Sequence, residues 1–406
     1  MTGSRILFCT PRFPYPLIGG DRIKSYHMLL HLARHHEVHL VTFAKGDQAA
    51  PENIQAIERL GVHIHPVPFH PLRAGLKSIE TLYTDRPLEI AFYTQPEFQA
   101  RVDELTQQMK FDVGIAFFMR TAEYLRNKSF RKILVAEDCR ELYQLRSYES
   151  SNNMLQQLIR WWEVRKLRRY EPEVVRHFDY TTFVTNTDIE AMRKGNPDAE
   201  YRLLTNGVDL DEFAFLPEQD KRDGVLFFGK LDVWANHMMV TRIAEKIRPL
   251  IQRDAPRTQF RIVGARPGEL EQRFAATDFS FFADVPDIRE YVNNSAVFLH
   301  PHRGASGIQN KVLQAMSMGC PVVTTPTGVQ GIEAVHGEHA LIGESDAELA
   351  RHCVALLEDP ALRERLARNA RTMIARTHSW DLVYEQLDDI LAPAGAGLRN
   401  RAHSPS

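Results

Sequence analysis

Short apolar runs and amphipathic segments alternate along the first half of the chain. RILFC, from Arg5, is typical of a buried strand, residues 21–36 repeat apolar positions at helical spacing, and EVHLVTF, from Glu37, is typical of a second strand. Further strand-like runs follow, separated by longer segments compatible with helices: GVHIHPV, FDVGIAFF, KILVAED and DYTTFVT. This alternation predicts an α/β domain with a parallel sheet covered on both faces.

A second alternation begins beyond residue 208. Asn-Gly, proline and a run of charges interrupt the periodicity first, as a domain entry does. The β-prone runs that follow are GVLFFGK, QFRIVG, FSFFADV, AVFLHP, PVVTT and ALIG, and residues 346–376 are compatible with one long helix. We therefore predict two α/β domains, a C-terminal helix that packs back toward the first domain, and a disordered tail, with bounds 1–208, 209–378, 379–392 and 393–406.

The segment GASGIQNKVLQAMSMGCPVV places two glycines between a strand and a helix that we predict from Gly307. In open parallel sheets, ligands bind at the carboxyl ends of the strands, where such turns lie. Glycine lets the backbone approach a ligand, and the unpaired amides of a first helical turn suit a phosphate. Lys311 and Gln314, three residues apart, share one face of this helix. The segment is therefore a candidate diphosphate site.

A structural alternative stands beside this hypothesis. Ser306 followed by Gln309 matches a capping box, so the segment would only start a helix. Lys311 would then be an ordinary solvated lysine.

Composition narrows the function classes. With 50 basic and 52 acidic residues the formal net charge is −2, so no overall field draws the chain to nucleic acid. The four cysteines lie far apart without a CxxC pair, which argues against a zinc site or a disulfide framework. No apolar run suits a signal peptide or reaches the ~18 residues needed to span a bilayer. We expect a soluble, cytoplasmic protein that does not bind nucleic acid.

Four stretches, in order along the chain, resemble the GT-B glycosyltransferases of family 4. They are GGDRIKSYHMLLHLARHHEVHLVTF, NGVDLDEF, FFGKLDVWANHMMV and GIQNKVLQAMSMGCPVV. The first and last are most similar to bacterial sugar transferases of exopolysaccharide assembly. The resemblance implies two Rossmann-like lobes with a cleft between them, a nucleotide-sugar donor, and an acceptor hydroxyl on a glycan or a lipid-linked molecule.

The resemblance also assigns roles to residues of the first lobe and to one residue after the first strand of the second lobe. Gly19 and Gly20 match the loop that approaches the donor diphosphate or the acceptor; otherwise they form a tight turn. Arg22 follows in the first helix, where it would clamp a phosphate. Lys230 stands where the family usually has arginine and would neutralise the leaving nucleoside diphosphate. The alternative for Lys230 is a surface lysine at a strand end.

The donor segment departs from the family pattern. The family often carries two glutamates eight positions apart, and this chain has Ser306 and Gln314 in their places. Gln314 can still accept hydrogen bonds from a ribose, whereas Ser306 is too short to replace a glutamate near the donor sugar. Gly307, Ile308 and Lys311, between these two positions, complete the donor site that the resemblance implies.

Asp138, next to Glu137, ends the strand-like run LVAED, where a carboxylate would orient a sugar hydroxyl; the alternative is a cap for the next helix. The family retains anomeric configuration and lets the donor phosphate receive the acceptor proton, so the resemblance implies no nucleophile, cofactor or metal. We set aside a metal site at His31, His35 and His39, because a strand interrupts their helical spacing and no carboxylate partner is evident.

Residues 160–176 combine paired tryptophans with six basic and three acidic residues. A basic amphipathic helix with aromatic side chains binds anionic lipid surfaces, which predicts peripheral contact with the inner face of the cell membrane. The alternative is that Trp161 and Trp162 pack against the first lobe.

Together these features predict a retaining, metal-independent glycosyltransferase of cell-surface or extracellular polysaccharide synthesis. A non-catalytic sugar-nucleotide-binding scaffold is one alternative, because acidic residues of the family are replaced. A nucleotide-sugar 2-epimerase, which would need a donor but no acceptor, is another.

Overall fold

The computed structural model describes residues 3–392 apart from 18, 82, 150, 152, 218–221, 266–267, 276, 278 and 305–306. The chain forms two compact units: unit 1 runs to Thr205 and resumes at Val383, and unit 2 is Asn206–Leu382. The predicted tail, 393–406, lies outside the described residues. Among the described helices, none is long and apolar enough to cross a lipid bilayer.

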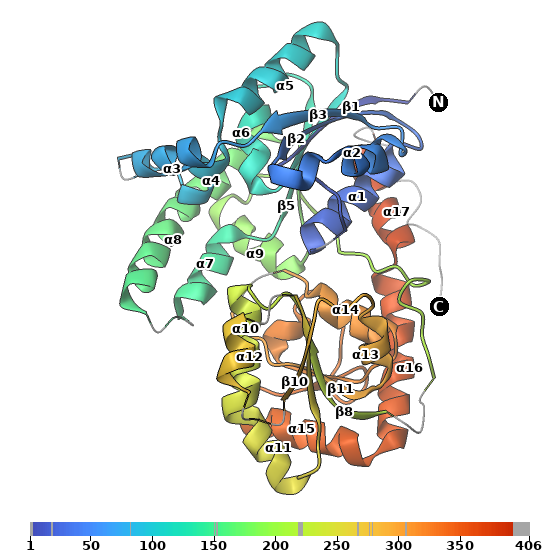
Figure 1. Ribbon diagram of the computed structural model, residues 1–406. Helices are drawn as coiled ribbons and strands as arrows, with labels where there is room; N and C mark the ends of the chain where they lie inside the picture. The colour runs from blue at the N-terminus through green and yellow to red at the C-terminus, as the bar shows by residue number, and fades with distance from the viewer. Residues whose placement is uncertain are drawn as a thin grey trace. The chain divides into compact units, whose positions relative to one another are not determined.

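Unit 1 is built on a seven-stranded sheet in the order β3-β2-β1-β4-β5-β6-β7, and all neighbouring strands are parallel (Figure 1). The residues of β1 from Ile6 to Cys9 are all buried, so both faces of the sheet are covered, as the continuous apolar runs predict. The strands are β1 (Arg5–Thr10), β2 (Glu37–Ala44), β3 (His63–Pro68), β4 (Val113–Phe117), β5 (Arg131–Glu137), β6 (Tyr180–Phe183) and β7 (Tyr201–Leu203).

Helices connect these strands and pack on the sheet. They are α1 (Gly20–Leu32), α2 (Pro51–Glu58), α3 (Pro71–Glu80), α4 (Leu88–Tyr93), α5 (Pro96–Gln108), α6 (Ala122–Leu125), α7 (Arg140–Glu149), α8 (Met154–Val174) and α9 (Asn186–Gly195). The C-terminal helix α17 (Trp380–Leu391) begins in unit 2 and continues into unit 1, where Asp388 binds His31 and Tyr384 binds His27.

Unit 2 has a six-stranded parallel sheet in the order β10-β9-β8-β11-β12-β13. Its strands are β8 (Asp223–Phe228), β9 (Phe260–Gly264), β10 (Phe279–Ala283), β11 (Ser295–His300), β12 (Val322–Thr324) and β13 (Leu341–Ile342). Its helices are α10 (Trp234–Arg242), α11 (Arg248–Asp254), α12 (Gly268–Arg273), α13 (Arg289–Asn293), α14 (Asn310–Ser317), α15 (Asp346–Glu358) and α16 (Pro360–Thr377).

Two predicted helices differ from the structure. The long helix predicted over 346–376 is two helices, because Pro360 cannot continue α15 and the Asp359 carboxylate instead caps α16 by accepting from the Leu362 amide (2.9 Å). The helix predicted from Gly307 begins at Asn310, because Gly307 is in the left-handed region (φ +80°) and Gln309 is still extended.

Candidate functional site

The carboxyl ends of the unit 2 strands form one edge of the sheet. The strand order reverses between β8 and β11, because β9 and β10 lie on one side and β12 and β13 on the other. In open parallel sheets this switch point is where ligands bind. The loop after β8 and the segment from β11 into α14 both start at this edge, so it is the first candidate site.

Lys311 extends from the first turn of α14 to the end of β8. Its Nζ donates to Asn236 Oδ1 (2.5 Å) and lies 5.3 Å from the centre of the Phe227 ring. Asn236, in α10, donates in turn through Nδ2 to the carbonyl of Lys230 (2.7 Å). These contacts bring α14, α10 and the loop after β8 together around one ammonium group. We call Phe227, Lys230, Asn236 and Lys311 the Lys311 site.

Two glycines keep space beside this ammonium. A Cβ on Gly264 would lie 1.8 Å from the carbonyl oxygen of Gly229, and a Cβ on Gly229 would lie 3.1 Å from Lys311 Nζ. A side chain at either position would therefore displace the backbone or the lysine.

The Lys311 ammonium forms no ion pair with any described residue. Its contacts are a neutral amide and an aromatic face, which do not replace the lost hydration, and desolvation lowers the pKa of Lys311 to about 7. A phosphate group at this position would supply the missing negative charge and favour the protonated lysine. The structural alternative, a solvated surface lysine, is wrong, since Lys311 is only partly exposed and bonded to Asn236.

His300, the last residue of β11, is fully buried. Within the described part of the chain, neither of its ring nitrogens has a hydrogen-bond partner. Burial, with the nearby charge of Lys311, lowers the pKa of His300 well below its usual value, so the ring is neutral. The sequence interpretation gave neither His300 nor Asn236 a role; the position of His300 at the end of a strand was the available signal.

The other residues predicted for the donor site differ in their surroundings. The Lys230 side chain is 51% exposed, and its ammonium already lies 3.6 Å from the Asp232 carboxylate. Ile308 is buried. Gln314 is half-buried, and its side-chain amide makes no hydrogen bond to a described residue.

The predicted capping box is only partly visible. Ser306 lies outside the described residues. The N-cap of α14 is Gln309, which makes no side-chain capping bond.

A second edge lies in unit 1, where β1 and β4 end on either side of the strand-order reversal. Gly19 (φ +105°) precedes α1, which has no side-chain cap, and Gly20 is the first helical residue. Arg22 Nη1 donates to the carbonyl of Pro16 (3.5 Å). The predicted residues of the first loop thus lie at the carboxyl edge of this sheet.

A buried ion pair joins α1 to the end of β5. Lys24 Nζ lies 2.7 Å from Glu137 Oε1 and also donates to the carbonyl of Leu204 (2.7 Å). Glu137 has φ +73° and Phe118, after the adjacent strand β4, has φ +66°. Such conformations cost free energy in residues with a Cβ and persist where surrounding contacts hold them, often at functional sites.

Asp138 belongs to a charged network at the same edge. It lies 3.2 Å from Arg140, which also pairs with Glu89 (2.9 Å), and Glu89 in turn pairs with Arg120. The two arginines lower the pKa of Glu89 to about 2, against the effect of its burial. At the start of α7, Glu171 accepts the backbone amides of Arg140 (2.9 Å) and Glu141 (2.8 Å).

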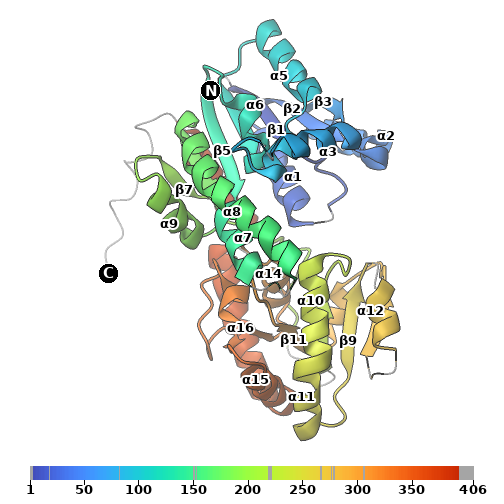
Figure 2. The same cartoon turned by 90° about the vertical axis from the view of Figure 1, so that its left-hand side faces the viewer.

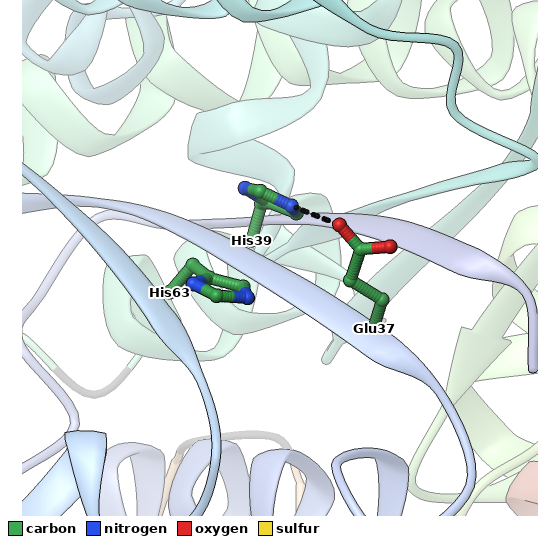
Figure 3. A group of neighbouring side chains, drawn as sticks. All are labelled: Glu37, His39 and His63. Carbon is green, nitrogen blue, oxygen red and sulfur yellow. Dashed lines mark hydrogen bonds and ion pairs between the residues drawn. The ribbon is translucent and has the colours of Figure 1, made fainter.

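Histidines gather on β2 and β3 of unit 1, toward the amino ends of these strands and away from the carboxyl edge of the same sheet. Figure 3 shows the His39 and His63 rings side by side, with Glu37 bonded to His39. Each of these three residues offers one ligand atom, and the three atoms lie within 4.8 Å of one another. Carboxylate partners, which were not evident from the sequence, thus exist for His39 and also for His31, 2.8 Å from Asp388.

Hydrogen bonds already account for the Glu37–His39 contact. His39 Nε2 lies 3.0 Å from Glu37 Oε1, and His39 Nδ1 lies 3.1 Å from His65 Nε2. Arg5 holds the other Glu37 oxygen (2.9 Å), and its charge opposes a cation there. The expectation that the protein needs no metal remains a prediction.

Comparison with known proteins first concerns unit 2. Residues 222–359, which contain the Lys311 site, match the family Glycosyl transferases group 1. Over 134 residues, 30% of this chain and 35% of the relative, the sequence is 26% identical to the capsular polysaccharide biosynthesis glycosyltransferase CapM of Staphylococcus aureus.

Two comparisons extend over nearly the whole chain. An uncharacterized 44.6 kDa protein in the cps region of Klebsiella pneumoniae is 20% identical over 401 residues, 95% of this chain and 99% of the relative. The crystal structure of Anabaena Alr3699/HepE in complex with UDP and glucose aligns with 96% of this chain and 99% of that chain, with a TM-score of 0.68 and 15% identity. At this identity the likeness shows the fold alone, which is GT-B with two Rossmann-like α/β halves, as predicted.

Proposed function

We propose that the protein is a glycosyltransferase that binds a nucleotide-sugar donor at the Lys311 site and transfers the sugar to an acceptor hydroxyl. The observation that carries the proposal is a partly buried ammonium that has no anionic partner among the described residues. It lies at the switch point of a parallel sheet, within the segment that matches Glycosyl transferases group 1.

The donor diphosphate would bind between the end of β8 and the start of α14. As the bond between the anomeric carbon and the diphosphate oxygen breaks, negative charge grows on the leaving nucleoside diphosphate, and Lys311 stabilises that charge at short range. Lys230 contributes a second cation once its ammonium turns from Asp232 to the phosphate. The backbone amides after Gly307, including that of Ile308, add donors next to the helix N-terminus.

Gln314 would bind the nucleotide ribose. It lies one helical turn beyond Lys311 on the same helix, and its amide is not engaged by another described side chain. An amide oxygen accepts hydrogen bonds from ribose hydroxyls, although without the charge assistance of a carboxylate. Ser306, outside the described residues, stands where the resemblance implies a glutamate near the donor sugar, and serine is the smaller side chain.

The acceptor would bind at the carboxyl edge of unit 1, near Gly19, Gly20, Arg22 and Asp138. The acceptor oxygen forms the new bond to the anomeric carbon, and its proton passes to the departing phosphate, so anomeric configuration is retained without a side-chain nucleophile. No metal or cofactor is needed in this scheme, because lysine and amide groups neutralise the phosphates.

A role in cell-surface polysaccharide synthesis is the context we propose. It is supported by the capsular glycosyltransferase CapM and the cps-region protein among the relatives, and by the UDP and glucose bound to the similar Anabaena protein. The acceptor is then a growing glycan or a lipid-linked saccharide.

The test is ligand-induced thermal stabilisation followed by a transfer assay. A nucleoside diphosphate at 100 times its Kd should stabilise the protein by about 2.7 kcal/mol, and Lys311→Ala should lose this effect. The donor that stabilises best is then incubated with glycan and lipid-linked acceptors, and the product's anomeric configuration is determined. Donor binding without any transfer would favour the scaffold alternative, and failure of every nucleotide to bind would contradict the proposal.

A further inference from the structure

The large apolar side chains that are exposed in the described part of the chain are unevenly distributed. Most of them belong to two segments of unit 1, in and after α3 and in the first half of α8: Leu72, Leu76, Ile79, Tyr83, Leu88, Met154, Leu155, Leu158, Ile159 and Trp161. Leu72, Tyr83 and Met154 are each more than 80% exposed, at 86%, 88% and 86%. We call this set the α3–α8 surface. Where exposed apolar side chains gather on a protein surface, they mark sites that bind a protein or a membrane.

Helix α3 is amphipathic, but its apolar face is exposed to solvent. Leu72, Leu76 and Ile79 follow the i, i+4, i+7 spacing of one helix face, and all three are exposed. On the opposite side Ala74 is the buried residue. Surface helices normally turn such an apolar stripe to the core, so the stripe of α3 is available to a partner.

Helix α8 changes character along its length. In its first half Met154, Leu158 and Trp161 again follow helical spacing and are exposed. In its second half Leu167 and Val174 are buried against unit 1. The apolar surface therefore lies largely before the segment 160–176 in which a membrane contact was predicted.

Buried polar contacts fasten the segment after α3 to the middle of α8. Lys166 Nζ donates to the carbonyls of Thr81 and Arg86, and the Glu163 carboxylate accepts the Leu88 amide (2.9 Å). Lys166 is thus a structural residue with 5% exposure, and not one of the lipid-binding cations that the sequence suggested. These contacts fix α3 and α8 relative to each other, and Figures 1 and 2 show both helices on the same side of unit 1.

An open hollow lies between the segment that follows α3 and helix α8. It is lined by Tyr83, Thr84, Asp85, Trp161, Trp162, Arg165, Lys166 and Arg169. The Arg165 guanidinium lies 5.1 Å from the centre of the Trp161 ring, and Arg169 lies 3.3 Å from Asp85. Tryptophan, tyrosine and arginine around apolar side chains are the residues that favour a membrane–water interface.

We propose that the α3–α8 surface docks unit 1 onto an anionic lipid bilayer, with the apolar side chains entering the interface and the arginines contacting lipid phosphates. The net charge of −2 offers no general attraction to such a surface, so the binding must be local. A second copy of the chain is the rival occupant, and the oligomeric state measured below distinguishes it from a bilayer.

Flotation of the full-length protein with phosphatidylcholine vesicles, with and without phosphatidylglycerol, tests this proposal. The natural protein should bind the anionic vesicles, and binding should weaken as salt rises. Leu72→Ser, Leu76→Ser and Ile79→Ser together should lower vesicle affinity by at least about tenfold. Arg165→Gln and Arg169→Gln should each lower it by about fivefold.

Matched controls separate docking from folding and from catalysis. Val335→Ser, at an exposed apolar residue of unit 2, should leave vesicle binding unchanged, and all variants should keep the natural Tm, because these side chains are exposed. Lys311→Ala should still bind vesicles, since docking does not rest on the proposed function. Unchanged flotation of the triple variant would overturn the proposal, as would a natural dimer that the triple variant converts to monomer while vesicles bind neither.

Discussion

Two lysines near the switch points of the two sheets have opposite surroundings. Lys24 in α1 and Lys311 in α14 each follow a strand that borders the strand-order reversal of a parallel sheet. Lys24 is paired with Glu137 and a backbone carbonyl, whereas in the described part of the chain Lys311 contacts the neutral Asn236 amide and the Phe227 ring. The first cation is neutralised from within the fold, so it stabilises structure. The second has no anionic partner among the residues that the structure describes, so it is suited to bind an external anion.

Among the substitutions proposed here, we expect the largest change in free energy for Lys24. Lys24→Met leaves the buried Glu137 carboxylate without its partner, which should lower the free energy of unfolding by about 3–5 kcal/mol. Urea denaturation of the variant measures this change. Lys24→Met combined with Glu137→Gln should recover part of the loss, and a loss below about 1 kcal/mol in the single variant would show that the pair is not structural.

Lys311 should give the opposite result. Lys311→Met removes a desolvated charge, so the Tm should stay the same or rise, while nucleoside diphosphate binding should weaken by about 1.5–3 kcal/mol. Isothermal titration calorimetry and thermal unfolding on the same samples measure both. Lys311→Arg, which keeps the charge, should retain part of the affinity. If Lys311→Met lowers the Tm and leaves the affinity for nucleoside diphosphate unchanged, Lys311 is a structural residue and does not bind the ligand.

A second residue of α14, Gln314, tests whether this helix contacts the nucleotide ribose. Gln314→Ala should weaken nucleotide binding by roughly 1 kcal/mol, and Gln314→Glu should keep or tighten it, because a carboxylate accepts ribose hydrogen bonds more strongly. All three residues have good helix propensity, so the Tm should not change. If neither variant alters the affinity for any nucleotide, Gln314 does not contact the ligand.

The smallest effect is expected at Lys230. Its ammonium is half exposed and already has Asp232 as a partner, so Lys230→Ala should weaken diphosphate binding by less than about 1 kcal/mol. Titration of Lys230→Ala and of Lys311→Ala with the same nucleoside diphosphate compares the loss of affinity in the two variants. Equal losses in the two variants would mean that Lys230 leaves Asp232 and contacts the phosphate as closely as Lys311 does.

Local sequence patterns predicted the sheets well because parallel strands buried on both faces appear as continuous apolar runs, as in β1 and β11. They missed β7, whose three residues form no pattern, and the break at Pro360 within an otherwise helical segment. The long-range contacts were beyond any local pattern. Asn236 meets Lys311 across 75 positions, and the outward direction of the α3 stripe depends on where the core lies.

The central claim is that Lys311 binds an external anion. Proton uptake on ligand binding tests this claim most directly. The pKa of the free lysine is lowered to about 7, and a bound diphosphate raises it, so affinity from this group is fully present below that pH and declines as the pH rises above it. Calorimetry at about pH 8 in buffers of different ionisation enthalpy should therefore show more protons taken up by the natural protein than by Lys311→Met. The difference between the two proteins excludes the protons that the diphosphate itself takes up or releases, because both proteins bind the same ligand. Equal proton uptake by the two proteins would contradict the account.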